Sequence, residues 1–89
     1  MKAVISVIGR DSVGIIAKVS KSCADYGVNI QDISQTVLDN YFSMIMIADT
    51  DKITIPFNDF VDIMTELGRQ NSLEIRTMHE EIFNSMHRI

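Results

Sequence analysis

The sequence predicts an α+β fold, in which four strands and two helices follow in the order strand–helix–strand–strand–helix–strand and a short helix ends the chain. Three observations support this prediction. Short β-branched and apolar runs alternate with segments whose apolar residues recur at helical spacing. Asp39-Asn40, residues that tolerate a positive φ, separate two of the runs and predict a hairpin turn. Gly27 follows the first helical segment and Pro56 opens the second.

The first predicted strand is the apolar run at residues 3–8, and residues 9–11 form the turn after it. Residues 13–26 carry apolar side chains at helical spacing and predict a helix with one buried face, formed by Ile15, Ile16, Val19, Cys23 and Tyr26. Gly27 stands where a left-handed conformation ends a helix. Gly14 is unexpected near the helix start, because glycine costs about 1 kcal/mol relative to alanine inside a helix.

The remaining elements follow from the same signals. Residues 28–38 predict a second strand, although its two faces mix apolar and polar side chains. Residues 41–48 are almost continuously apolar and predict a third strand, antiparallel to the second, central in the sheet and covered on both faces. The second helix starts at Pro56 and ends near residues 68–71, and its apolar positions are Phe57, Phe60, Val61, Met64 and Leu67.

The end of the chain predicts one more strand and one more helix. Residues 73–78 alternate apolar and polar side chains, which is typical of a strand. The tail helix is expected to carry one apolar stripe, with acidic residues at its start and Arg88 near its end, as the helix dipole favours. The stripe consists of Ile82, Phe83 and Met86.

This order of elements is the split βαβ or ferredoxin-like pattern, βαββαβ. Right-handed crossovers place both helices on one face of a four-stranded antiparallel sheet, so that a two-layer sandwich results. The other face then has no helix apart from the short C-terminal one. We therefore expect that tail helix or a second chain to cover the apolar residues of the third strand.

Length and composition indicate one domain over residues 1–89, with a core at 3–78 and the C-terminal helix at 79–88. The net charge of −4 and the scattered basic residues argue against nucleic-acid binding. A single cysteine excludes an internal disulfide and suits a reducing compartment. The N-terminal apolar run is too short for a signal peptide, and no run approaches the roughly 20 residues that span a bilayer. We expect a soluble, cytoplasmic protein without membrane contact.

Other candidate sites are weak. Cys23 lies on the apolar helix face and is expected to be a core residue. His79 and His87 could hold a metal with Glu80, but their spacing matches no known ligand pattern, so a helix cap and a surface histidine are the preferred interpretation. Residues 49–54 share the first positions of a calcium loop but lack its glycine and terminal glutamate. With both histidines in the tail, no nucleophile–base pair can be assembled, and neither an enzyme nor a cofactor is expected.

Two glycine motifs carry a resemblance to a known family. Gly9-x-Asp11-x-x-Gly14-Ile15 follows the first strand, and Gly27-x-Asn29-Ile30 leads into the second. With the order of elements, these motifs make residues 3–78 resemble the ACT domain, a small regulatory module that usually binds amino acids. The first motif often has proline before its second glycine, where this chain has Val13. The stretches "ISQT" and "YFSMIMI" and the tail "HEEIFNSMHRI" resemble small stand-alone prokaryotic ACT proteins, akin to the ACT repeats of the glycine-cleavage-system repressor.

The resemblance implies a ligand site at the start of the first helix, with part of its lining often supplied by a neighbouring chain. Free N–H groups and the helix dipole favour an anion there, and glycine lets the backbone approach a ligand. The backbone amides near Val13 to Ile15 would hold a carboxylate, and Asp11 or Asn29 would accept from an ammonium group. The implied lining residues are Arg10, Asp11, Ser12, Val13, Gly14, Ile15, Asn29, Ile30 and Gln31.

The resemblance therefore implies a regulatory homodimer. It would bind an amino acid or similar small metabolite and signal to another, unidentified protein. A second interpretation remains open. Asp11 or Ser12 can be a helix N-cap, worth about 1 kcal/mol; Gly14 can serve close packing on the sheet; and Asn29 can be a turn residue. The chain would then be a ligand-free dimerising adaptor or protein-interaction module, acting through the open sheet face and the tail helix.

Overall fold

The computed structural model describes residues 1–10 and 13–86 and confirms the predicted order of elements. The sheet has four strands in the order β2-β3-β1-β4, and every neighbouring pair is antiparallel. The elements are β1 (Lys2–Arg10), α1 (Ile15–Asp25), β2 (Asn29–Leu38), β3 (Tyr41–Asp49), α2 (Phe57–Gln70), β4 (Leu73–His79) and α3 (Glu80–Met86). None of the helices in the described ranges is long and apolar enough to cross a membrane.

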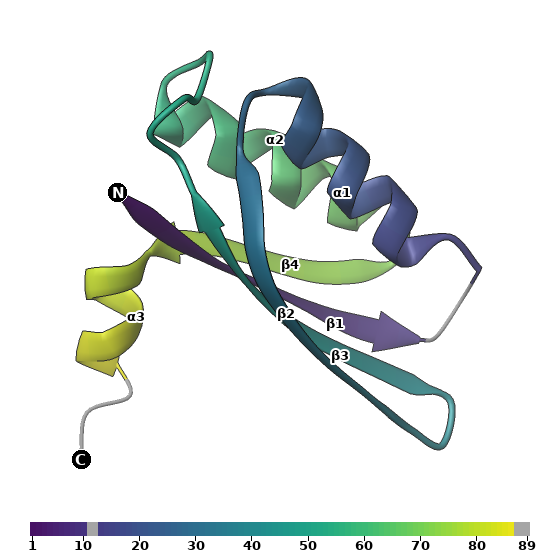
Figure 1. The fold of residues 1–89 in the computed structure, drawn as a ribbon. Coiled ribbons are helices and arrows are strands. Elements are labelled where there is room, and N and C mark those ends of the chain that lie inside the picture. Colours follow the sequence, from purple (N-terminus) through teal and green to yellow (C-terminus); the bar gives the residue numbers. More distant parts are fainter. Residues whose placement is uncertain (11–12, 87–89) are drawn as a thin grey trace.

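Helices α1 and α2 lie together on one face of the sheet, and α3 lies apart from them beyond the end of β4 (Figure 1). The core fills the space between the two layers. Three methionines, Met44, Met46 and Met64, are part of it. The buried core side chains are Ile5, Val7, Ile15, Val19, Cys23, Val28, Phe42, Met44, Met46, Ala48, Phe60, Met64, Leu73 and Ile75.

Strand β3 is central, as predicted, but the expectation that both its faces are covered is wrong within one chain. Phe42 and the alternate residues that follow it are buried beneath the helices. On the opposite face Tyr41 and Ile45 are exposed, Ile45 by 42%. The reason is that α1 and α2 cover a single face, and the tail helix is too short to cover the other.

The first helix starts two residues later than predicted and buries a narrower stripe. Ile15, Val19 and Cys23 are buried, whereas Ile16 is exposed, so its assignment to the buried face was wrong. A rotation of about 100° per residue carries Ile16 to the edge of the stripe. The predicted turn at residues 9–11 also starts late, because Gly9 and Arg10 still pair with β3.

Two predicted turns are confirmed by their backbone angles. Gly27 has a φ of 74°, and a Cβ at this position would lie 2.3 Å from the carbonyl oxygen of Lys52. Glycine is therefore required both by the conformation and by the close approach of the loop before α2. Asp39, in the hairpin between β2 and β3, has a φ of 58°.

The tail differs most from its prediction. His79 ends β4 and does not belong to the helix. In α3, Phe83 is half-buried while Ile82 and Met86 are exposed, so the three residues do not form one buried stripe. Glu80 and Glu81 occupy the first turn, as expected. His87 and Arg88 lie outside the described residues.

Candidate functional site

The start of α1 requires glycine for a backbone reason. Gly14 is the N-cap, in the left-handed conformation with φ 87° and ψ 8°, which residues with a Cβ adopt only at a cost. Its carbonyl oxygen accepts the N–H of Lys18 at 3.0 Å and so closes the first helical turn. Gly14 therefore lies before the first helical residue and not within the helix. The cost of glycine relative to alanine inside a helix does not apply to this position.

The space beside Gly14 is open. A Cβ built on this residue meets no described atom within 4 Å. The interpretation that Gly14 serves close packing on the sheet is therefore wrong. Asp11 and Ser12 lie outside the described residues, and Gly14 takes the N-cap position that was considered for them.

The electrostatics of this helix start favour an anion. The first N–H groups of a helix have no partners within it, and the dipole makes this end positive. Among the described residues no side chain caps these groups, and the first turn carries no acidic residue. Val13, which precedes Gly14, is 98% exposed, so an apolar side chain stands beside these amides.

A hydrogen bond to the end of the neighbouring helix α2 fixes this end of α1. Lys18 Nζ, one turn beyond Gly14, donates to Asn71 Oδ1 at 2.9 Å. Asn71 Nδ2 in turn donates to the carbonyl oxygen of Leu67 at 2.8 Å, at the end of α2. The helix start is thus tied to the turn between α2 and β4.

The structure does not bring the two predicted halves of the site together within one chain. Gly14 precedes α1 and Asn29 follows it, so the 11-residue helix of about 16 Å separates them. The register of the sheet agrees: Arg10 pairs with Tyr41 at one end of β3, whereas Asn29 pairs with Asp49 at the other end. Of the strand residues, Asn29 and Gln31 are exposed and Ile30 packs against the core.

A cavity of about 570 Å³ lies at the Asn29 end and was not predicted from the sequence. Two aspartates lie on its rim. Asp51 pairs with the Met1 amino group, and this hydrogen bond lowers the pKa of Asp51. Asp49 Oδ1 accepts the backbone N–H of Asp51 at 2.8 Å. The lining residues are Ala24, Gly27, Val28, Asn29, Asp49, Asp51 and Lys52.

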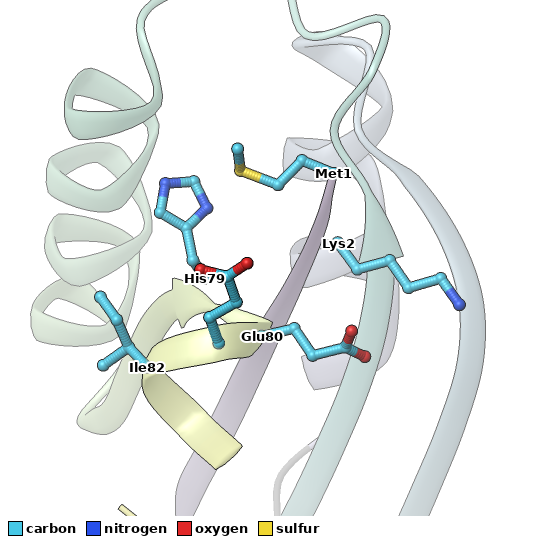
Figure 2. A pocket seen from close by; sticks show the side chains of 6 residues that line it. Met1, Lys2, His79, Glu80 and Ile82 are labelled. Carbon is cyan, nitrogen blue, oxygen red and sulfur yellow. The ribbon is translucent and has the colours of Figure 1, made fainter. Parts of the chain in front are cut away.

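Another cavity, of about 370 Å³, lies between the N-terminus and the junction of β4 with α3 (Figure 2). The Met1 side chain extends toward the His79 ring, while Lys2 points away from it. His79 stacks on Phe57 with ring centroids 4.0 Å apart, which fixes the imidazole against α2. Its buried Nδ1 has no hydrogen-bond partner in the described part of the chain.

The metal interpretation of this region gains no geometric support. Within residues 1–10 and 13–86, no three His, Cys, Asp or Glu side chains are grouped so that they could hold an ion. His87 lies outside the described residues. The stacking on Phe57 gives His79 a packing role that the sequence pattern did not reveal.

A two-layer sandwich with the element order βαββαβ is the ferredoxin-like architecture. The chain belongs to the ACT domain family, whose sequence profile matches residues 2–77. This match confirms the resemblance drawn from the two glycine motifs. The matched region contains all four strands, apart from the last two residues of β4, and does not include α3.

Individual relatives agree with this assignment. A UPF0237 protein of Clostridium perfringens is 49% identical over 89 residues, which is 100% of both chains. The solved ACT domain protein from Streptococcus pneumoniae is 40% identical with a TM-score of 0.81, and the match covers 93% of each chain. A putative glycine cleavage system transcriptional repressor shares the fold at 24% identity and a TM-score of 0.70, over 86% of this chain and 44% of that one.

Proposed function

We propose that this chain is a regulatory ACT domain that binds an amino acid or a similar small metabolite at the interface of a homodimer. One observation carries the proposal: no described residue fills the space beside Gly14, at the positive end of α1, and no described side chain caps the first backbone amides there. A small carboxylate has the charge and the size that this end of the helix favours.

Strand β2 is the edge through which a second chain would pair. It is ten residues long, and in the described part of the chain only β3 pairs with it. Ile33 and Val37 on β2, and Ile16 on α1, are exposed apolar residues along this side of the molecule. A long edge strand with exposed apolar side chains is a template for strand addition.

Antiparallel pairing of two β2 strands would also assemble the site. It sets the Asn29 end of one chain beside the Leu38 end of the other. Leu38 pairs with Tyr41, and Tyr41 pairs with Arg10, so this end carries the loop before α1. Each site of the dimer would thus combine Gly14 of one chain with Asn29 of the other.

In such a site the ligand would be held at both charged ends. Amides around Gly14 would bind the carboxylate, and the Asn29 side-chain oxygen or the Asp11 carboxylate would accept from the ammonium group. Val13 would contact the ligand side chain. Binding at an interface can regulate, because a ligand that touches both chains favours one way of docking them over another.

A thermal-shift screen of the twenty amino acids tests this proposal. A ligand at about 100 times its dissociation constant stabilises the protein by about 2.7 kcal/mol. This raises the melting temperature of so small a domain by about 11–22 °C. Gly14→Asn should abolish the shift, since asparagine tolerates the left-handed conformation but fills the space. Asp59→Asn introduces the same side chain as a control, because Asp59 is exposed in the first turn of α2, at the opposite end of that helix from Asn71.

A ligand-free adaptor is the second candidate function. The exposed Ile8 and Ile45 on the helix-free face favour it, since they offer apolar surface to a protein partner. A flat thermal screen from a chain that remains dimeric would support the adaptor over the sensor. A monomer at micromolar concentration in sedimentation would contradict both.

A further inference from the structure

A groove of about 500 Å³ lies on the helix-free face, between the sheet and α3. Val4 is 2% exposed even though neither α1 nor α2 covers this face, and Phe83 of α3 lines the same groove. A size of 300–1,000 Å³ and a largely apolar lining are typical of small-molecule sites. The apolar lining residues are Val4, Ile8, Met44, Ile45, Met78, Phe83 and Met86.

One ion pair stands at the rim of this groove. Glu74 and Arg76 are two residues apart on the edge strand β4, so both side chains lie on the helix-free face. Arg76 Nε donates to Glu74 Oε1 at 2.8 Å, and Arg76 Nη2 lies 2.6 Å from the same oxygen. In the register of the sheet, Glu74 is opposite Ile8 and Arg76 is opposite Ser6 on β1.

This pairing leaves one carboxylate oxygen of Glu74 and one guanidinium nitrogen of Arg76 without a partner among the described residues. Both contacts of Arg76 use Glu74 Oε1, so Oε2 keeps its acceptor capacity and Arg76 Nη1 keeps its donors among the described residues. Both side chains are more than half exposed. A lone anion or cation would be attracted by one partner and repelled by the other, whereas a zwitterion complements both charges at once.

We propose that this groove binds a free amino acid with a large apolar side chain. The α-carboxylate accepts from Arg76 Nη1, the α-ammonium donates to Glu74 Oε2, and the side chain lies on the apolar floor at Val4 and Phe83. The ion pair stays intact. This site is on the face opposite α1, so it is separate from the proposed site at Gly14 and does not depend on it.

An amide NMR titration of the full chain with leucine, methionine and phenylalanine tests the proposal. Shifts are expected at residues 4–8, 74–78 and 83–86. N-acetyl-leucine lacks the ammonium group and leucinamide lacks the carboxylate, so each should bind at least about tenfold more weakly than leucine. Serine should also bind more weakly, because it cannot cover the apolar floor. Equal binding of leucine and leucinamide would overturn the assignment of the carboxylate to Arg76.

Substitutions in the ion pair provide a second test of the proposed site. Arg76→Gln and Glu74→Gln should each weaken leucine binding about tenfold without unfolding the protein, since both side chains are exposed. Arg69→Gln is the matched control: Arg69 makes the same kind of pair with Glu66, through Nε at 2.8 Å, but on α2. The control should leave the titration unchanged. An Arg76→Gln chain that binds leucine as the parent does would overturn the proposal.

The position of the shifts separates this site from the one at Gly14. Shifts confined to residues 13–16 and 29–31 would support the dimer-interface site and overturn the groove. Shifts confined to the groove would support the groove and contradict the site at Gly14. Broadening of residues 74–86 that grows with protein concentration, without ligand, would mean that a second copy occupies the groove, and would also overturn the proposal.

Discussion

Gly14 and Asn29 lie at opposite ends of α1, so the two motifs that mark the candidate site face different ends of the sheet. One chain cannot close a small-molecule site around both. The proposed antiparallel pairing of two β2 strands would bring the Asn29 end of one chain to the Gly14 end of the other. The proposed ligand binding therefore depends on dimerisation. A substitution on the edge strand β2 alone tests this dependence.

Val37→Lys should convert the dimer to a monomer and remove the ligand response. Val37 is 50% exposed on β2, and a lysine on an edge strand blocks pairing with another chain. Sedimentation equilibrium at micromolar concentration measures the first effect, and the thermal shift measures the second. Ile82→Lys is the control, because Ile82 is 51% exposed but lies on α3. If the Val37→Lys chain stays dimeric, β2 is not the interface.

Two glycine substitutions should differ in their effect on stability. Gly14→Ala is expected to lower the free energy of unfolding by about 1–2 kcal/mol, the strain of a left-handed residue with a Cβ. Gly27→Ala carries the same strain, and its Cβ would also lie 2.3 Å from the Lys52 carbonyl oxygen. Gly27→Ala should therefore lower the free energy of unfolding clearly more than Gly14→Ala does. Urea unfolding of both variants measures the difference, and equal losses would contradict the close contact at Gly27.

Cys23 should make the protein less stable as the pH rises above 9. Burial raises the pKa of its thiol from an ordinary value near 9 to about 11. Between these values the unfolded chain loses the proton while the folded chain keeps it, so the free energy of unfolding falls with pH. The loss should reach about 1 kcal/mol by pH 10.

Comparison with Cys23→Ala isolates this contribution from that of other groups that titrate at alkaline pH. The difference in unfolding free energy between the two proteins should change between pH 8 and pH 10. A constant difference would mean that the thiol is not buried in the folded protein. At pH 8 the folded thiol should also resist alkylation, since only roughly one molecule in a thousand carries the thiolate.

The fold could be predicted because local signals agreed with one another. Apolar periodicity, the Asp39-Asn40 turn and Gly27 placed the main elements within one or two residues of their observed ends. The exposure of Ile16 and the open face at Ile45 could not be predicted in the same way. They depend on how the helices dock on the sheet and on how far a short tail helix can reach, and neither is encoded in a local pattern.

The candidate site was predictable only in part. The sequence marks Gly14 as unusual, but its left-handed backbone and the lack of described atoms beside it depend on the three-dimensional structure. The groove beside α3 gave no recognisable motif, because Glu74 and Arg76 look like an ordinary alternating strand. Glu74 and Arg76 lie at the rim of a groove because the chain turns into α3 after His79. His79 ends β4, whereas the sequence pattern predicted that it starts the helix.

Mixed dimers provide the sharpest test of a site shared between two chains. Gly14→Asn and Asn29→Ala should each abolish the response to the amino acid found in the thermal screen. When the two variants are mixed and allowed to exchange, a heterodimer places the unchanged Gly14 of one chain beside the unchanged Asn29 of the other. Its second site carries both substitutions.

Random exchange makes about half of the dimers mixed, so about a quarter of all sites should recover. Titration calorimetry of the mixture counts these sites, and each variant alone provides the baseline. A site built within one chain predicts no recovery, because every chain in the mixture carries a defect. Recovery of binding therefore distinguishes a site formed across the interface from one formed inside a single chain, whatever the affinity of the ligand.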